Sequence, residues 1–403
     1  MYIEQAQKNL SDWWRYLIGG FIIFFFWQII GGIPIITAIL YKVGLEGLST
    51  LEDPEKMFTV LENSSLTFFY LMLTFVIGLI GLLFTTKFLH NQTITNLTTS
   101  RSKIDWKRIA FAFFTWGLIS VSMTCLDVFY FRPDEYLYNF NFDRFLILAV
   151  LAILLVPLQT SFEEYLFRGY LMQGIGNVTR IKKSLYYVLI TIFCLVSYIY
   201  LIYNLLPSNI VLNIILFALY QFLIIKLFNL TSLTVKFIES NLYKTLYKMF
   251  STYLTPLIFT SVVFGLMHIA NPEVDKLGYF IMIFYIGTGF FLGIITLMDE
   301  GLELALGFHA ANNLFIALLV TADWTAFQTD SIFKATSDPT YIGWNEFIAN
   351  PLIISEIAIP VFVIFPTLLF IYSKKYNWSN WSDKLTGKVN SLPVSEQDVW
   401  GKR

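Results

Sequence analysis

Ten apolar segments restrict what this chain can fold into, because a helix of roughly 18 or more apolar residues spans the ~30 Å hydrocarbon core of a bilayer. The segments lie near residues 16–41, 65–87, 109–130, 145–170, 185–206, 208–228, 250–271, 279–298, 302–322 and 352–373. Hydrophobic residues make up 56% of the chain and charged residues 14%, against roughly 25% charged residues in soluble domains. These features predict an all-α polytopic integral membrane protein with about ten transmembrane helices.

Charge and cysteine content exclude several other classes of protein. The formal net charge is −1, which argues against a nucleic-acid-binding protein. Only Cys125 and Cys194 are present, both inside apolar segments, so we expect neither a structural disulfide nor a thiolate metal site. The first apolar segment is longer than the hydrophobic part of a signal peptide, so we predict that it is a retained helix.

Lysine and arginine side chains gather in alternate loops. The loop before the third segment, the turn at 177–184, the stretch at 229–249 and the C-terminal tail are basic, whereas the first loop and the long loop after residue 322 are acidic. Because cytoplasmic loops carry the excess of Lys and Arg, this alternation predicts that both termini are cytoplasmic.

Three charged side chains, Glu163, Glu164 and Arg168, lie together within the fourth apolar segment. A charge inside a membrane span costs at least ~2.5 kcal/mol on insertion scales, so each is a candidate functional residue. On a helix, Glu164 and Arg168 are an i,i+4 pair that can form an ion pair. Glu163 lies roughly 100° away around the helix, so we predict that it stays free and points into a cavity. The alternative interpretation is a structural ion-pair cluster, which would need only one glutamate.

The chain contains three histidines. His90 lies beside the basic loop before the third segment, which predicts a solvated loop residue. His268 ends an apolar run, and His309 has Asn313 at i+4 on the same helical face. Taken singly, His268 and His309 are typical of satisfied polar side chains between helices. Together with a glutamate pair, two imidazoles and a carboxamide are the groups needed to activate water and to stabilise an oxyanion.

These residues form three motifs, and in each motif the last residue lies four positions after an earlier one, about one helical turn. The motifs are Glu-Glu-x-x-x-Arg (Glu163, Glu164, Arg168), Phe-x-x-x-His (Phe264, His268) and His-x-x-x-Asn (His309, Asn313). In this order on hydrophobic segments, the set resembles the CPBP family of intramembrane proteases. That family contains the type II CAAX prenyl endopeptidases and the bacterial Abi-type proteins linked to bacteriocin processing and immunity. The resemblance covers about residues 145–322.

One departure from the family concerns spacing. Glu163 and His268 are 105 residues apart, a longer gap than in the family, and two extra apolar segments fill it. We therefore predict a catalytic core with an inserted helical hairpin near 185–228. The predicted organisation is N-terminal helices without matched motifs (1–144), the catalytic core (145–322), an outer loop with the last transmembrane helix (323–373) and a polar cytoplasmic tail (374–403).

The resemblance implies peptide-bond hydrolysis in a water-containing cavity between helices. Glu163 would act as the general base that takes a proton from water, and His268 would orient that water. His309 and Asn313 would donate hydrogen bonds to the carbonyl oxygen as it becomes an oxyanion. The predicted catalytic set is Glu163, Glu164, Arg168, His268, His309 and Asn313.

Nearly the same residues allow a metal-dependent version of this site. Glu163, His268 and His309 could bind Zn²⁺ with water as the fourth ligand, leaving Glu164 or Asn313 around the metal site. The family name implies a metalloprotease, but the chain has no His-Glu-x-x-His sequence. The sequence therefore leaves two cofactor predictions open, none or Zn²⁺.

Two other classes of function also stay open. A transporter could use Glu163, Glu164 and His309 to carry protons or substrate, although we find no two-fold hydropathy symmetry. A catalytically silent immunity or scaffold protein would keep the fold, although all seven motif positions are retained. The predicted partners are the lipid bilayer and a membrane-associated peptide or protein substrate, prenylated or not, and no nucleic acid. The Abi-type resemblance implies a prokaryotic plasma membrane.

Overall fold

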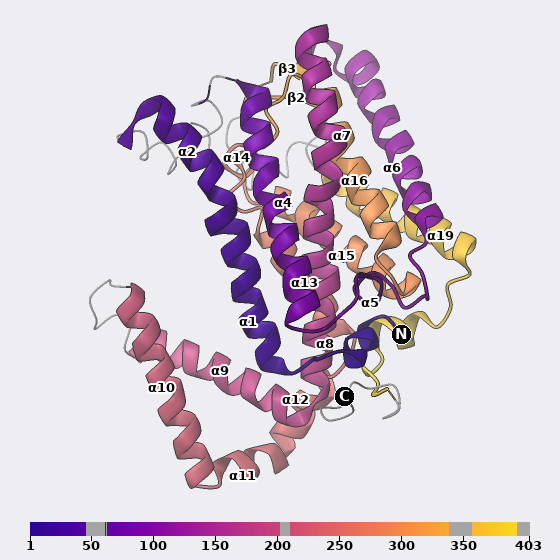
Figure 1. Ribbon diagram of the computed structural model, residues 1–403. Coiled ribbons are helices and arrows are strands. Elements are labelled where there is room, and N and C mark those ends of the chain that lie inside the picture. Colours follow the sequence, from indigo (N-terminus) through magenta and orange to yellow (C-terminus); the bar gives the residue numbers. More distant parts are fainter. Residues whose placement is uncertain (46–60, 62, 202–209, 338–356, 393–403) are drawn as a thin grey trace.

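A computed structural model describes residues 1–45, 61, 63–201, 210–337 and 357–392 of the chain. Helices make up nearly all of it (Figure 1). The first half contains η1 (Ile3–Lys8), α1 (Trp13–Phe24), η2 (Phe25–Ile30), α2 (Gly31–Val43), α4 (Ser64–Phe88), α5 (Ile94–Thr98), α6 (Trp106–Leu126), η4 (Asp127–Phe131), η5 (Pro133–Glu135), β1 (Tyr136–Tyr138), α7 (Phe142–Glu164), η6 (Tyr165–Leu171), α8 (Met172–Arg180) and α9 (Lys182–Leu201). The second half contains α10 (Ile210–Leu230), α11 (Leu233–Glu239), α12 (Asn241–Phe250), α13 (Leu254–Leu266), α14 (Pro272–Leu277), α15 (Ile281–Asp299), α16 (Glu303–Leu319), β2 (Val320–Thr321), β3 (Phe333–Ala335), η8 (Ile359–Ile364), α19 (Phe365–Tyr376) and α20 (Trp381–Thr386).

Each of the ten predicted segments contains helix among its described residues, while residues 202–206, 208–209 and 352–356 of these segments lie outside the described part of the chain. Within the described residues, eight helices are long and apolar enough to cross a membrane. They are Trp13–Val43, Ser64–Phe88, Trp106–Phe131, Phe142–Arg180, Lys182–Tyr200, Leu212–Leu230, Ile281–Asp299 and Ile359–Tyr376. The other two predicted segments are the shorter apolar helices Leu254–Leu266 and Glu303–Leu319. The prediction of an all-α polytopic integral membrane protein is confirmed.

The helices that carry the motifs lie in the middle of the bundle. Helix α16 packs against both α6 and α7, and α13 packs against α15. Glycines allow two of these close approaches. A Cβ atom on Gly307 in α16 would lie 2.0 Å from the carbonyl oxygen of Ile109 in α6, and one on Gly289 in α15 would lie 2.5 Å from the carbonyl oxygen of Ser261 in α13. Both distances are too short for any side chain, so these two contacts require glycine.

A small sheet closes the upper end of the bundle in Figure 1. Strand β3 is central, antiparallel to β1 and parallel to β2. The sheet joins the segment that follows α6 to the segments on either side of the loop after α16. It therefore fixes the upper ends of α6, α7 and α16 relative to one another.

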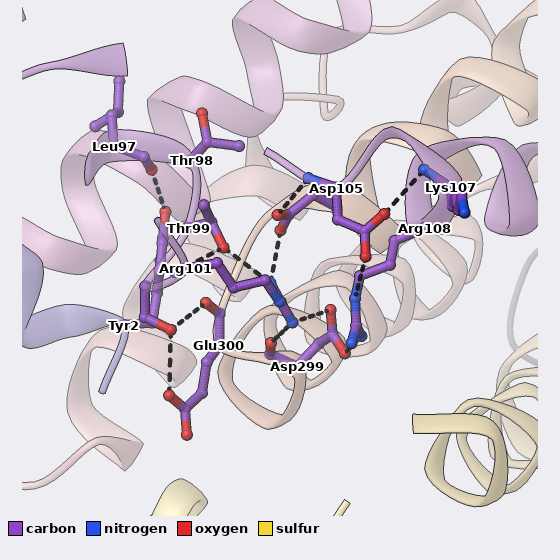
Figure 2. A network of polar contacts seen from close by, with 12 residues as sticks. Tyr2, Leu97, Thr98, Thr99, Arg101, Asp105, Lys107, Arg108, Asp299 and Glu300 are labelled. Atoms are coloured by element: carbon purple, nitrogen blue, oxygen red, sulfur yellow. Dashed lines mark hydrogen bonds and ion pairs between the residues drawn. The ribbon is translucent and has the colours of Figure 1, made fainter. Parts of the chain in front are cut away.

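A network of charged side chains fastens the other end of the bundle. Figure 2 shows Arg101 and Arg108, which precede and begin α6, converging on Asp299 at the end of α15. Arg101 lies 3.0 Å from Asp299 and 3.1 Å from Glu303 at the start of α16. Both carboxylates are buried, and the indole nitrogen of Trp378 donates a hydrogen bond of 3.0 Å to Asp299. The network fixes the turn between α15 and α16 against α6.

His90 is not a solvated loop residue, so that prediction was wrong. Only 1% of its surface is exposed. Its Nδ1 lies 2.8 Å from the carbonyl oxygen of Leu10, and its Nε2 lies 2.9 Å from the hydroxyl of Tyr170. Burial lowers the pKa of His90 to about 4. His90 is buried by residues far away in the sequence, because the N-terminal segment before α1 covers the turn between α4 and α5.

Helices α9 to α12 form an appendage beside the lower ends of α1 and α8 in Figure 1. Helices α9 and α10 are joined by hydrogen bonds from Tyr198 to Asn213 (3.0 Å) and from Gln221 to Thr191 (2.7 Å). The appendage has a hydrophobic cluster of its own, centred on Tyr186, Ile190, Cys194 and Tyr243. This is the region in which we predicted an inserted hairpin.

The predicted polar tail is partly helical. It includes the end of α19 and the whole of α20. Residues near its end contact the N-terminal segment, because Gln7 donates a hydrogen bond of 2.7 Å to the carbonyl oxygen of Asn390. The two end segments of the described chain therefore lie at the same end of the bundle.

Candidate active site

The helix that carries the glutamates changes its winding at the site. Glu163 and Glu164 are the last residues of α7, and the chain continues through the π-helical turn η6 before α8 begins. Arg168 lies in this turn. Single π-helical turns inside α-helices occur frequently at functional sites, because they redirect side chains without ending the helix.

Glu164 is the centre of the first set of contacts. Its Oε1 accepts hydrogen bonds from Nη1 of Arg168 at 2.9 Å and from Nδ1 of His309 at 2.7 Å. All three side chains are buried. The predicted ion pair between Glu164 and Arg168 is therefore present, and it also connects α7 to α16.

Arg168 extends these contacts to two further helices. Its Nη2 donates a hydrogen bond of 3.2 Å to the carbonyl oxygen of Gly289 in α15. Its guanidinium carbon lies 4.1 Å from the centre of the Phe264 ring in α13, a cation–π distance. One buried arginine thus contacts α7, α15 and α13.

The contact with Glu164 also determines which ring nitrogen of His309 carries the hydrogen. A carboxylate only accepts hydrogen bonds, so Nδ1 of His309 carries the hydrogen. In the neutral imidazole Nε2 then carries the lone pair, and this nitrogen lies 3.4 Å from Oε2 of Glu163. Glu163 therefore lies within ion-pair distance of a nitrogen that can accept a proton, with Glu164 orienting the ring as a carboxylate orients the histidine in a hydrolytic triad.

Glu163 differs from its neighbour in exposure. Its side chain is 13% exposed whereas that of Glu164 is fully buried. The second carboxylate oxygen of Glu163, Oε1, accepts a hydrogen bond of 2.8 Å from Gln159 one turn earlier in α7. Glu163 is therefore the more accessible of the two carboxylates and faces His309 across the helix interface.

Asn313 lies one turn after His309 in α16. Its Nδ2 donates a hydrogen bond of 3.0 Å to Oε1 of Gln159. Its Oδ1 accepts one of 3.0 Å from the neighbouring Asn312. Asn313 is therefore held toward α7, on the side of α16 that also presents His309.

His268 joins the cluster through Phe264. It lies in the turns that follow α13, with Nδ1 2.8 Å from the carbonyl oxygen of Phe264 and its ring stacked on Tyr285 at 4.4 Å. The Phe264 ring lies 5.0 Å from the imidazole of His268 and 5.8 Å from that of His309. The predicted residues of all three motifs thus meet, with one aromatic ring in contact with both histidines.

The proposed zinc ligands do not form a metal site. Throughout the described part of the chain, no group of three His, Cys, Asp or Glu side chains is placed to hold a metal ion. Glu163 and His309 are neighbours, but no third His, Cys, Asp or Glu of the described residues completes a group around them that could hold a metal ion. Because this arrangement does not fit the ligand set, we derive no step through a metal.

Four residues that contact the site were not identified from the sequence. Gln159, Asn312 and Trp116 form the hydrogen bonds beside Glu163 and Asn313, and Tyr285 stacks on His268. Gln159 carried a detectable signal, because it is a polar residue inside a membrane span, four residues before Glu163. Trp116 and Tyr285 are ordinary members of aromatic segments and carried none.

Comparison with known proteins shows which family the sequence around this site resembles. Residues 236–315 match the sequence model of the type II CAAX prenyl endopeptidase Rce1-like family. The resemblance to the CPBP family is confirmed. The matched region holds the second and third motifs, from Phe264 to Asn313, while the glutamate motif precedes it. The family that this region resembles is one of CAAX-type intramembrane proteases, which are hydrolases.

A relative extends the similarity to nearly the whole chain. "Uncharacterized protein YyaK" of Bacillus subtilis (strain 168) is 24% identical over 379 residues, which cover 93% of this chain and 96% of the relative. No solved structure is significantly similar to the chain. The similarity to YyaK therefore takes in most of the N-terminal helices as well as the site.

Proposed function

We propose that this protein is an intramembrane endopeptidase that hydrolyses peptide bonds in membrane-associated or lipid-modified proteins or peptides. The observation that carries the proposal is the contact between Glu163 and His309, in which Glu164 and Arg168 orient the imidazole. A base held by a second carboxylate is the arrangement that hydrolases use to activate a nucleophile. Here the nucleophile is water.

The proton path follows from the two nitrogens of His309. A water molecule beside Glu163 gives its proton to the pair formed by Glu163 and Nε2 of His309, and the resulting hydroxide attacks the peptide carbonyl carbon. The carbon–nitrogen bond then breaks, and the proton passes from the pair to the departing amine nitrogen. The water proton thus ends on the new amine, and the hydroxyl ends on the new carboxyl group.

Asn313 and His268 have supporting roles in this mechanism. Asn313 uses one amide hydrogen for Gln159, so its second amide hydrogen is available to the developing oxyanion. His309 also donates to that oxygen once Nε2 has received the water proton. His268 holds Nδ1 against the carbonyl of Phe264, which leaves Nε2 to accept a hydrogen bond from the attacking water.

The proposed location is a prokaryotic plasma membrane, and the Bacillus relative supports this. The proposed substrate class is a peptide segment next to a membrane anchor, because a catalytic pair placed among membrane-spanning helices acts on chains held at the bilayer. A prenyl group is one such anchor.

The test compares protein termini in membranes of cells that express the wild type or Glu163→Gln at matched levels. Glu163→Gln keeps the size of the side chain and removes the base, which we expect to reduce cleavage by roughly 10²–10⁴-fold. Glu135→Gln is the matched control, because Glu135 lies in the loop after α6 and its side chain is 45% exposed.

New termini should appear with the wild type and with Glu135→Gln and should be absent with Glu163→Gln. The same termini in all three samples would contradict the proposal. If the wild type cleaves no peptide and Glu163→Gln abolishes the transport of a solute, the result would favour a transporter. A phenotype that survives Glu163→Gln would favour a silent immunity protein.

A further inference from the structure

We infer that Gln159 is a positioning residue for the proposed reaction, as the last link of a one-way hydrogen-bond chain that runs from Trp116 to Glu163. The inference rests on the proposed function. The chain passes from α6 through α16 to α7, so it connects the base to two neighbouring helices.

The direction of the chain is set at Trp116. An indole N–H can donate a hydrogen bond but cannot accept one. Nε1 of Trp116 lies 3.1 Å from Asn312, so the Asn312 atom that faces it must be the carbonyl oxygen Oδ1. The Nδ2 group of Asn312 is then the group that faces Asn313, and it donates to Oδ1 of Asn313 at 3.0 Å.

The same reasoning passes through the next two amides. Because Oδ1 of Asn313 is occupied as an acceptor, its Nδ2 is the group that faces Gln159, and it donates to Oε1 at 3.0 Å. The Nε2 group of Gln159 is then left to donate to Oε1 of Glu163 at 2.8 Å. One tryptophan thus determines the orientation of three amides, which could otherwise flip.

The chain has two consequences for the proposed chemistry. Glu163 has one carboxylate oxygen held by Gln159, so its other oxygen is directed at Nε2 of His309. Asn313 cannot turn its carbonyl oxygen toward a substrate, because that oxygen is held by Asn312. The carboxylate of Glu163 is therefore oriented toward His309, and Asn313 keeps its amide N–H group directed toward the site.

Gln159 and Trp116 are both buried. If Gln159 only filled space between the helices, an apolar side chain of the same size could replace it. The chain requires more than burial, because a donor must face Glu163. Leucine is close to glutamine in size and has no donor, so Gln159→Leu separates the two interpretations. Gln173→Leu is the matched control, because Gln173 is an equally buried glutamine of the same long helix, hydrogen-bonded to Asn96 away from Glu163.

The first measurement uses a substrate peptide identified by the comparison of termini. We expect Gln159→Leu to lower kcat by roughly 10–100-fold, because a misplacement of a catalytic group by about 1 Å can cost about 10²-fold. KM should change less than about threefold, and Gln173→Leu should leave kcat near the wild-type value. Trp116→Phe should lower kcat less. The double variant should be no worse than Gln159→Leu alone, because both changes interrupt one chain. Unchanged kcat in Gln159→Leu, or additive losses in the double variant, would overturn the inference.

The second measurement does not depend on activity. An infrared spectrum of the purified protein at fixed pH records the carboxyl or carboxylate stretch of Glu163, identified by its absence in Glu163→Gln. Among the described residues, the other charged or titratable groups around Glu163 are Glu164 and Arg168 on its own helix, His309 on α16 and His268 after α13. They are unchanged in Gln159→Leu.

A carboxyl group that loses the hydrogen bond of a donor such as Gln159 loses a charge-assisted contact, which changes its stretching frequency. The Glu163 band should therefore be displaced in Gln159→Leu and should coincide in the wild type and Gln173→Leu. An unchanged band would overturn the inference whatever the activity. A displaced band in a protein that cleaves no peptide would leave the inference standing and refute the proposed protease function.

Discussion

Arg168 offers the sharpest test of how the site is held together. Arg168→Met removes the guanidinium but keeps a long apolar side chain. Both Arg168 and Glu164 are fully buried and lie 2.9 Å apart. Breaking a buried ion pair by removing one partner typically costs about 3–5 kcal/mol, because the other charge stays buried without compensation. The carbonyl oxygen of Gly289 and the ring of Phe264 lose a partner as well.

The double variant Glu164→Gln, Arg168→Met removes both charges. Replacing a buried ion pair by neutral groups is often close to neutral in stability, so the double variant should regain most of the loss. Arg144→Met is the control, because Arg144 is an exposed arginine near the start of the same helix, where substitutions usually change stability by less than about 0.5 kcal/mol.

The assay is equilibrium unfolding of the purified protein in mixed detergent micelles. We expect the free energy of unfolding to fall by about 3 kcal/mol or more for Arg168→Met, to recover in the double variant and to stay unchanged for Arg144→Met. A loss below about 1 kcal/mol for Arg168→Met would refute the reasoning, as would a double variant no more stable than Arg168→Met.

Two further predictions concern pH and metal ions. Burial lowers the pKa of His90 to about 4, below its unfolded value of about 6.5. The unfolded chain therefore binds the proton first, and His90 should cost the fold up to about 3 kcal/mol as pH falls from about 6.5 to 4. His90→Gln should remove this part of the pH dependence of the melting temperature, and an identical pH profile would contradict the assignment. Because no three-residue metal group is found in the described part of the chain, cleavage should persist after exhaustive chelation, and a loss that zinc restores would contradict this expectation.

Local sequence rules predicted the helices and the short-range pairs of the site. Hydrophobic length located all ten segments, and the i,i+4 rule identified the pair formed by Glu164 and Arg168. Both rules depend only on neighbours within one helix. The contact between Glu164 and His309 links positions 145 residues apart, so the sequence could predict it only through the family resemblance.

The features that were missed share a dependence on distant segments. His90 is buried because the residues near Leu10 fold back over it. The orientation of Gln159 is set by Asn313, and through it by Trp116 on a third helix. Spacing along one helix contains no information on such contacts, and hydropathy does not distinguish a tryptophan that donates into a polar chain from one that only fills space.

The long gap between the glutamate motif and His268 does not separate them in space. The appendage of α9 to α12 leaves the bundle after Arg180 and returns to the same place. Two hydrogen bonds join its ends: Tyr247 donates to the carbonyl oxygen of Arg180 at 2.7 Å, and Tyr243 donates to the carbonyl oxygen of Lys182. Loop-closure entropy grows only with the logarithm of loop length, so a detour that closes on itself costs little. Arg168 still contacts Phe264 directly. We therefore expect the insertion to affect how substrates reach the protein, while the chemistry depends on α7, α13 and α16, which position the motif residues.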